Sequence, residues 1–248
     1  MINRKISKSI IPNTATALNI ASGFLSLIFA SQGDFHMAAL FIFIAAFFDL
    51  IDGLLARLTK TASMFGVELD SLADVVSFGA APAFLIYQSY LIKYDIWGIV
   101  ISSLLLIFGA FRLARFNVQV EDIKIKLDFN GLPIPFSALA ITSLVLFYHN
   151  GVNIIKPFDS MIIPLVIVLS LLMVSNIKYN TLPKVKKLDS VGKLFLSVLA
   201  IVALILISIS KGEAIFYLIW LHILYGIIRY FVLKFFKSEN QVEVKVNK

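Results

Sequence analysis

Residues 37–58, with the sequence MAALFIFIAAFFDLIDGLLARL, form an apolar run that carries two acidic residues, Asp49 and Asp52. The run is long enough to cross a bilayer, because a hydrocarbon core about 30 Å thick needs roughly 20 helical residues. Comparable apolar runs, separated by short polar breaks, occupy most of the chain. The sequence therefore predicts an all-α, polytopic integral membrane bundle of about eight transmembrane helices, at residues 14–31, 37–58, 67–90, 96–116, 132–149, 160–176, 191–210 and 214–233.

The composition agrees with this prediction. Of 248 residues, 59% are hydrophobic and 15% are charged, and the mean hydropathy is +0.91. An ordinary soluble domain is roughly 45–50% apolar and about 25% charged. The chain also contains no cysteine. These values exclude a cytosolic enzyme, a disordered tail protein, a disulfide scaffold and a thiol-dependent catalyst.

The formal charge of +7, from 22 Lys and Arg against 15 Asp and Glu, is by itself compatible with nucleic-acid binding. However, all basic residues except Lys93, Lys156 and Lys211 fall on one side of the predicted spans. The positive-inside rule requires this asymmetry of cytoplasmic loops. We therefore expect a multi-pass cell-membrane protein with both termini in the cytoplasm and no nucleic-acid partner. The first span is expected to be a helix rather than a signal peptide, because Asn19 interrupts its apolar run.

Four aspartates lie within predicted spans, where each costs about 2.5–3.5 kcal/mol if unpaired at the bilayer centre. On a helix, Asp49 and Asp52 are about 60° apart and share one face. Gly66, Asp70 and Asp74 recur every four residues and therefore form one stripe on the next span. Because a short loop joins the two spans, we expect them to be antiparallel neighbours with the acidic faces together.

Four adjacent carboxylates repel one another unless cations neutralise them. Oxygen ligands without His or Cys favour a hard divalent ion, and two Mg²⁺ or Mn²⁺ ions would balance the four aspartates. The three histidines, His36, His149 and His222, are scattered along the chain. They are expected to be interfacial residues, so zinc chemistry is not supported.

Several residues around this cluster admit two interpretations. Gly53, Ala56 and Gly66 allow either close helix packing or space for a ligand against the backbone. Arg57 is either a positive-inside anchor or a phosphate or ribose contact. The prolines of residues 131–135 either begin the fifth helix or shape a turn that lines a cytoplasmic cavity.

The acidic residues belong to a longer pattern, Asp49-x2-Asp52-Gly53-x2-Ala56-Arg57-x8-Gly66-x3-Asp70-x3-Asp74. This pattern resembles the complete signature of the CDP-alcohol phosphotransferase family. Further segments resemble the phosphatidylserine synthase branch of that family, and the similarity covers roughly residues 10–185. They are Pro12-Asn13-x-Ala15-Thr16-x2-Asn19, Phe111-Arg112-Leu-Ala-Arg115-Phe-Asn117, Gly131-Leu-Pro133-x-Pro135 and Ser175-Asn-x-Lys-Tyr179.

The resemblance implies transfer of a phosphatidyl group from CDP-diacylglycerol to an alcohol, here L-serine, with release of CMP. It implies that Asp49, Asp52, Asp70 and Asp74 hold two divalent ions and that Asp74 is also the base. It further implies a homodimer, a catalytic core over 1–185 and additional C-terminal helices over 186–248. Contacts to the CDP-lipid are assigned by the resemblance to Asn13, Thr16, Gly53, Arg57, Ser63 and Gly66.

The sequence indicates the alcohol acceptor less clearly than it indicates the transfer reaction. Family members that use glycerol 3-phosphate usually have arginine where Asn19 stands, so the resemblance favours serine over glycerol 3-phosphate or an inositol phosphate. Arg112 and Arg115 are candidates to bind the carboxylate of serine or the lipid phosphate, although both would also serve as positive-inside anchors. Buried carboxylates alone would also suit a cation transporter, but such a path does not need the glycine and arginine framework.

Overall fold

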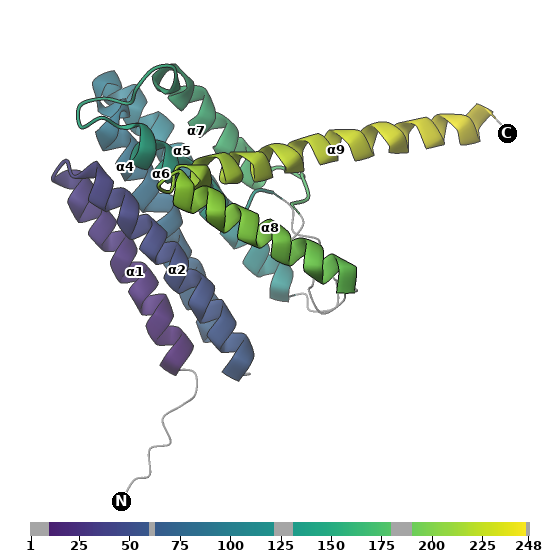
Figure 1. Cartoon of the computed structure of the whole chain (residues 1–248), viewed down its shortest axis with the longest axis horizontal. Coiled ribbons are helices and arrows are strands. Elements are labelled where there is room, and N and C mark those ends of the chain that lie inside the picture. The colour runs from purple at the N-terminus through teal and green to yellow at the C-terminus, as the bar shows by residue number, and fades with distance from the viewer. Residues whose placement is uncertain (1–9, 60–62, 122–130, 180–189, 247–248) are drawn as a thin grey trace, which may run out of the picture.

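The computed structural model describes residues 10–59, 63–121, 131–179 and 190–246 (Figure 1). Within these ranges the chain is a bundle of helices, with an isolated β-bridge between His149 and Ile154. The elements are α1 (Ile10–Ser31), α2 (Phe35–Thr59), α3 (Met64–Asp74), the π-helical segment η1 (Val75–Ala80), α4 (Ala81–Ser89), the short 3₁₀ segment η2 (Leu91–Tyr94), α5 (Asp95–Glu121), α6 (Ile134–Tyr148), α7 (Phe158–Val174), α8 (Ser190–Ile209) and α9 (Ala214–Val246).

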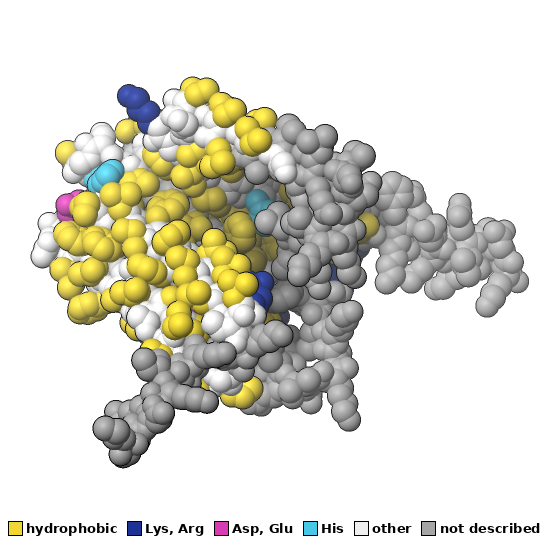
Figure 2. Space-filling view, turned by 60° about the horizontal axis from the view of Figure 1, so that its bottom comes forward, with side chains coloured by type: hydrophobic (Ala, Val, Ile, Leu, Met, Phe, Trp, Pro, Cys, Tyr) yellow, Lys and Arg dark blue, Asp and Glu magenta, His cyan; other side chains and the backbone are white. Residues whose placement is uncertain are grey.

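The predicted all-α membrane bundle is confirmed, and each predicted apolar run corresponds to a helical element. Five helical stretches in the described part of the chain are long and apolar enough to cross a membrane: Ile10–Ser31, Phe35–Thr59, Met64–Ser89, Leu91–Val118 and Ala214–Lys234. Two shorter apolar helices, α6 and α7, complete the compact part of the bundle. Figure 2 shows hydrophobic side chains over most of the coloured surface of one face. In a membrane protein this is the surface that meets lipid.

The first two helices form an antiparallel hairpin, and α2 also packs against α6 (Figure 1). The helix α1 packs in turn against α3, η1 and α4, while α5 packs against α7. The core consists mainly of aliphatic side chains with no exposed surface, such as Ile42, Leu85 and Ile141. The acidic second half of α2 therefore lies in a bundle whose described helices pack mainly through apolar side chains.

The third predicted span is one helix whose hydrogen-bond pattern changes after Asp74. The backbone N–H of Ala81 donates to the carbonyl of Val76, which is the five-residue spacing of a π-helix. Pro82 explains the irregularity, because it has no N–H to donate and its ring crowds the carbonyl four residues earlier, that of Phe78. The wider turn thus begins directly after the last aspartate of the predicted acidic stripe.

Residues 131–133 form the tight turn before α6. Gly131 has φ +86°, and a Cβ at this position would collide with the carbonyl of Met173. The N–H groups of Gly131 and Leu132 donate to the carbonyls of Ile177 (2.8 Å) and Leu172 (2.9 Å). Of the two interpretations of these residues, the helix start therefore describes their structure: α6 begins at Ile134, and the turn closes on the end of α7.

The C-terminal pair is attached to the bundle through α9, since α8 packs mainly against α9. The hydroxyl of Tyr148 donates to the carboxylate of Glu213 (2.7 Å) and lies 2.9 Å from the hydroxyl of Tyr217. The rings of Phe136 and His222 stack with centroids 4.5 Å apart. Beyond these contacts, α9 projects well past the other helices (Figure 1), and its helix is longer than the predicted run at 214–233.

Candidate active site

Three aspartates from two helices meet at the predicted acidic cluster. The carboxylates of Asp49, from α2, and of Asp70 and Asp74, from α3, each place an oxygen within 4.8 Å of the others. Two of these oxygens, Asp70 Oδ1 and Asp74 Oδ1, are buried and have no hydrogen-bond partner in the described part of the chain. At such a distance, two unit charges repel by about 3.5 kcal/mol at an effective dielectric constant near 20. The repulsion therefore has to be relieved by a bound proton, by a nearby basic side chain or by a cation from outside the chain.

A pocket of about 120 Å³ adjoins the acidic cluster at Asp70. Asp70 belongs to both features, so a ligand in the pocket would lie beside the carboxylates. The fourth aspartate, Asp52, lines the pocket and has a buried oxygen, Oδ2, that lacks a partner among the described residues. The remaining lining residues are Pro12, Asn13, Thr16, Gly53, Ala56, Ser63, Gly66 and Val67.

The start of α3 shapes one wall of the pocket. Ser63 is the N-cap of this helix, and its hydroxyl accepts a hydrogen bond from the N–H of Gly66 at 3.1 Å. Ser and Thr are common at this position because their oxygen satisfies an N–H that has no partner within the helix. A Cβ on Gly66 would lie 3.2 Å from this hydroxyl and 3.8 Å from the side-chain oxygen of Asn13. Ser63 and Gly66 therefore both form the N-cap of α3 and line the pocket.

The opposite wall comes from α1. Thr16 is buried, and its hydroxyl donates to the carbonyl of Pro12 at 3.1 Å and interacts with the carboxylate of Asp52. Asn13 lies one turn earlier and reaches towards Gly66. Five of the six residues that the sequence assigned to the CDP-lipid, together with Asp52 and Asp70, thus line one cavity, and their ligand roles stay predictions.

Arg57 is the predicted CDP-lipid contact that does not line this pocket. Its Nε donates to the carbonyl of Gly53 at 2.8 Å, so the side chain folds back along α2. One guanidinium nitrogen lies 3.6 Å from the position a Cβ on Gly53 would occupy. The guanidinium is therefore next to the pocket wall, at the exposed end of α2.

The two arginines of α5 have different surroundings. Arg112 is only 9% exposed, its Nε has no hydrogen-bond partner in the described chain, and its charge interacts with that of Asp74. Arg115 instead donates from a guanidinium nitrogen to the carbonyl of Val174, at the end of α7, at 3.2 Å. Arg112 is thus adjacent to the acidic cluster, whereas Arg115 makes a contact that connects two helices.

Two local environments near the cluster were not predicted, although Asn19 and Asn117 both belong to segments that carry the family resemblance. The side chains of Ser71 and Asn117 exchange hydrogen bonds between α3 and α5, at 3.0 and 3.3 Å. Asn19 on α1 is fully buried, and neither its amide nitrogen nor its amide oxygen has a partner among the described residues. An amide left unpaired in the interior costs about 1–3 kcal/mol. The sequence signal for both was the presence of Asn117 and Asn19 within otherwise apolar runs.

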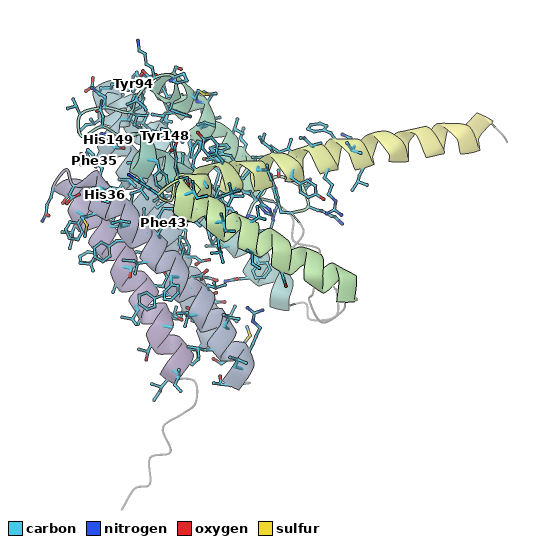
Figure 3. The ribbon with its side chains drawn as sticks, viewed as in Figure 1. Phe35, His36, Phe43, Tyr94, Tyr148 and His149 are labelled. Carbon is cyan, nitrogen blue, oxygen red and sulfur yellow. The ribbon has the colours of Figure 1, made fainter. Side chains whose placement is uncertain are left out.

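Two of the three histidines, His36 and His149, lie away from the carboxylates (Figure 3). Figure 3 shows His36 and His149 beside Phe35 at the end of the bundle where α2 begins, whereas Asp49 and Asp52 follow in its second half. The ring of His149 packs edge-on against Phe35, with centroids 4.9 Å apart, and burial lowers the pKa of its imidazole. Its Nδ1 accepts a hydrogen bond from the N–H of Gly151 at 3.1 Å, which requires a neutral ring.

The donor set fits a hard divalent cation. It consists of carboxylate oxygens, several of them buried without a partner, and the nearby positive charge of Arg112 balances only one of four negative charges. Oxygen ligands of this kind suit Mg²⁺, Mn²⁺ or Ca²⁺ rather than softer metals.

Comparison with known proteins identifies the family. Residues 9–172 match the family model described as CDP-alcohol phosphatidyltransferase. A CDP-diacylglycerol--serine O-phosphatidyltransferase of Helicobacter pylori is 36% identical over 222 residues, which cover 90% of this chain and 91% of that protein. A protein of the same name from Methanocaldococcus jannaschii is 35% identical, over 89% of this chain and 94% of the relative. The archaetidylserine synthase of Methanothermobacter thermautotrophicus is 37% identical, over 72% and 73% of the respective chains. Because the family model matches residues 9–172 and these relatives align over most of their length, the chain belongs to the CDP-alcohol phosphatidyltransferase family.

Proposed function

We propose that this protein transfers a phosphatidyl group from CDP-diacylglycerol to the hydroxyl of L-serine, which yields phosphatidylserine and CMP. The observation that carries the proposal is the direct connection, through Asp70, between a carboxylate cluster and a small pocket to which Asn13, Thr16 and Ser63 contribute polar atoms. The named activities of the similar proteins support serine as the acceptor. The reaction belongs to membrane phospholipid synthesis, and the bundle of apolar helices supports the use of a lipid substrate from the membrane.

Two divalent ions, Mg²⁺ or Mn²⁺, would be held by Asp49, Asp52, Asp70 and Asp74. Bound there, they would neutralise the carboxylates and polarise the pyrophosphate for displacement. Mg²⁺ commonly takes one or two carboxylates together with substrate phosphates. The unpaired buried oxygens of Asp52, Asp70 and Asp74 support this assignment.

Asp74 is proposed as the general base. It is 8% exposed and lies at the end of α3, on the side of the cluster nearest Arg112. It would accept the proton of the serine hydroxyl as the serine oxygen bonds to the phosphorus that carries diacylglycerol. The bond between this phosphorus and the bridging oxygen of the pyrophosphate breaks, and the electron pair leaves with CMP. Positioned proton acceptance of this kind contributes about 10²–10⁴-fold to a rate.

The CDP group would occupy the pocket between α1 and the start of α3. Gly53 and Gly66 keep its walls close to the backbone, while Asn13, Thr16 and Ser63 offer polar atoms. Arg57, next to the wall at Gly53, would reach a phosphate once it leaves the Gly53 carbonyl. The diacylglycerol tails would extend from this site into the surrounding lipid.

Serine is proposed to bind on the α5 side of the cluster. Arg112 has an unpaired Nε beside Asp74, and a guanidinium suits the carboxylate of serine. Asn19 replaces the arginine of glycerol-phosphate users with a neutral amide that can both donate and accept. Arg115 would contribute less, since it also bonds to the end of α7.

We further propose that the active site and both termini face the cytoplasm of a cell-membrane enzyme, on the basis of the distribution of basic residues. The catalytic core would comprise 1–185, and 186–248 would be an addition, which agrees with a family match that ends at residue 172. The family resemblance supports a homodimer as the working form.

An acceptor panel tests the function. Purified protein in detergent micelles that contain CDP-diacylglycerol is given serine, glycerol 3-phosphate or an inositol phosphate, with Mn²⁺ or with EDTA, and CMP release is measured. We expect release only with serine and only with the metal. CMP release with another acceptor but not with serine would support a phosphatidyltransferase and refute serine as its acceptor. No release with any acceptor, despite metal binding, would refute the transferase.

A further inference from the structure

The backbones of α1 and η1 touch immediately beyond the acidic cluster. A Cβ on Gly23 would lie 2.7 Å from the Cα of Ser77 and closer still to its hydroxyl oxygen. Cβ atoms in proteins essentially never approach a backbone atom so closely, so only glycine fits at position 23 with this arrangement. Ser77 lies three residues after Asp74, on the same continuous helix.

One hydrogen bond fixes the register of the same contact. The hydroxyl of Ser77 donates to the carbonyl of Asn19 at 3.0 Å, and both residues are fully buried. Asn19 is one helical turn before Gly23, so the bond and the close approach lie on the same stretch of α1. That stretch is one turn beyond Thr16, which contacts Asp52 in the site.

The contact matters because η1 is a weak point of the helix. Its π-helical hydrogen bonds leave a wider turn, and Pro82 removes one donor from the next turn. A helix interrupted in this way can rotate or bend about the irregular turn at lower cost than a regular α-helix. Asp70 and Asp74 lie directly before it, and a rotation by one residue would turn their carboxylates by about 100° away from Asp49.

We propose that Gly23 and Ser77 are positioning residues: their contact fixes the rotation of the helix that carries Asp70 and Asp74, and thereby keeps these carboxylates opposite Asp49. Neither residue contacts the substrate in this role. The Ser71–Asn117 pair would restrain the same helix from the α5 side. The role of the contact in catalysis depends on the proposed function, whereas its effect on the geometry of the carboxylates does not.

The test measures Mn²⁺ binding by electron paramagnetic resonance, together with CMP release. In Gly23→Ala the added methyl pushes η1 away from α1, so we expect Mn²⁺ affinity and turnover each to fall at least tenfold. Ser77→Ala removes only the hydrogen bond, and at least threefold weaker Mn²⁺ binding is expected. In the double variant Gly23→Ala/Ser77→Gly, two of the three close contacts are removed, which should restore part of the lost affinity. Ala21→Val is the matched control, because residue 21 is exposed on the same helix; it should bind Mn²⁺ as the parent does.

A merely structural role would lower the melting midpoint of the variants and leave the Mn²⁺ affinity of the folded fraction equal to that of the parent. Mn²⁺ affinity within twofold of the parent in folded Gly23→Ala would overturn the proposal. If Gly23→Ala cannot be purified, the same result in Ser77→Ala would overturn it. A parent that binds Mn²⁺ but releases no CMP would refute the proposed function and leave this test intact, whereas a parent without Mn²⁺ binding would overturn both.

Discussion

Removing one charge from the acidic cluster should stabilise the metal-free protein while it weakens metal binding. In Asp70→Asn, the side chain keeps its size but loses repulsion with Asp49 and Asp74, whose oxygens lie within 4.8 Å. Each pair is worth about 3.5 kcal/mol at an effective dielectric constant near 20, or about 7 kcal/mol for two pairs. An Asp with an ordinary pKa can instead take up a proton at pH 7 for about 4 kcal/mol, so this value limits the gain.

The expected gain can be measured as a shift in thermal stability. For a chain of this size, 1 kcal/mol of stability corresponds to roughly 2–4 °C in the melting midpoint. A gain of about 2 kcal/mol, half of the protonation cost, therefore predicts that Asp70→Asn melts at least about 4 °C above the parent in EDTA. With saturating Mn²⁺ the parent should melt above the variant, because Mn²⁺ at 100 times its dissociation constant stabilises the parent by about 2.7 kcal/mol. The variant lacks one metal-binding carboxylate, so Mn²⁺ should stabilise it less.

A control separates this effect from a general effect of charge. Asp34 is exposed and its carboxylate caps α2 by accepting from the N–H of Met37 at 3.0 Å. Asparagine caps about as well as aspartate, so Asp34→Asn should leave both midpoints close to those of the parent. A lower midpoint for Asp70→Asn in EDTA, or an undiminished response to Mn²⁺, would refute the reasoning that these carboxylates repel one another and share a cation.

Four further outcomes are expected. Asp74→Asn should remain folded and lose at least about 10²-fold in serine-dependent CMP release, and near-normal turnover would remove Asp74 from the base role. Arg112→Ala should raise the serine concentration needed for half-maximal turnover more than that of CDP-lipid; unchanged serine kinetics would leave Arg112 a topological anchor. Gly131→Ala should lower stability by at least about 1–2 kcal/mol, because its φ is +86°, and an unchanged melting midpoint would contradict this. The contribution of His149 to stability should fall as the pH drops below about 6.5, since burial lowers the pKa of its imidazole and the unfolded chain binds the proton more readily. Below that pH, His149→Gln should therefore lose less stability than the parent does, and an identical pH dependence of the two proteins would contradict this contribution.

The sequence was sufficient for the helices and for much of the site because both depend on local spacing. Apolar runs predict the membrane-spanning helices. Gly66, Asp70 and Asp74 are four residues apart, which places them on one face of a helix. The short loop between α2 and α3 then limits how far apart the two acidic faces can be. These constraints need no knowledge of the rest of the fold.

What the sequence did not provide depends on contacts between distant segments. Ser77 bonds to a carbonyl 58 residues earlier, and Ser71 pairs with a side chain 46 residues later. Periodicity does not predict either partner, because the hydroxyls of many polar residues in apolar helices donate to a backbone carbonyl of the same helix. The π-helical turn was likewise not predicted, although Pro82 in the middle of a predicted span was a local sign of it.

The same arrangement explains why a membrane bundle can contain four carboxylates at all. Without cations, the cluster opposes folding, and the apolar contacts of α1, α2 and α6 must hold α2 and α3 together against it. In the proposed function, cations and a pyrophosphate would recover this opposing free energy, because the buried oxygens of Asp52, Asp70 and Asp74 would then gain partners that the described chain does not supply. Stability and substrate recognition are therefore linked at these residues: a cluster already satisfied by its own side chains would be more stable without ligands and would bind neither metal nor nucleotide tightly.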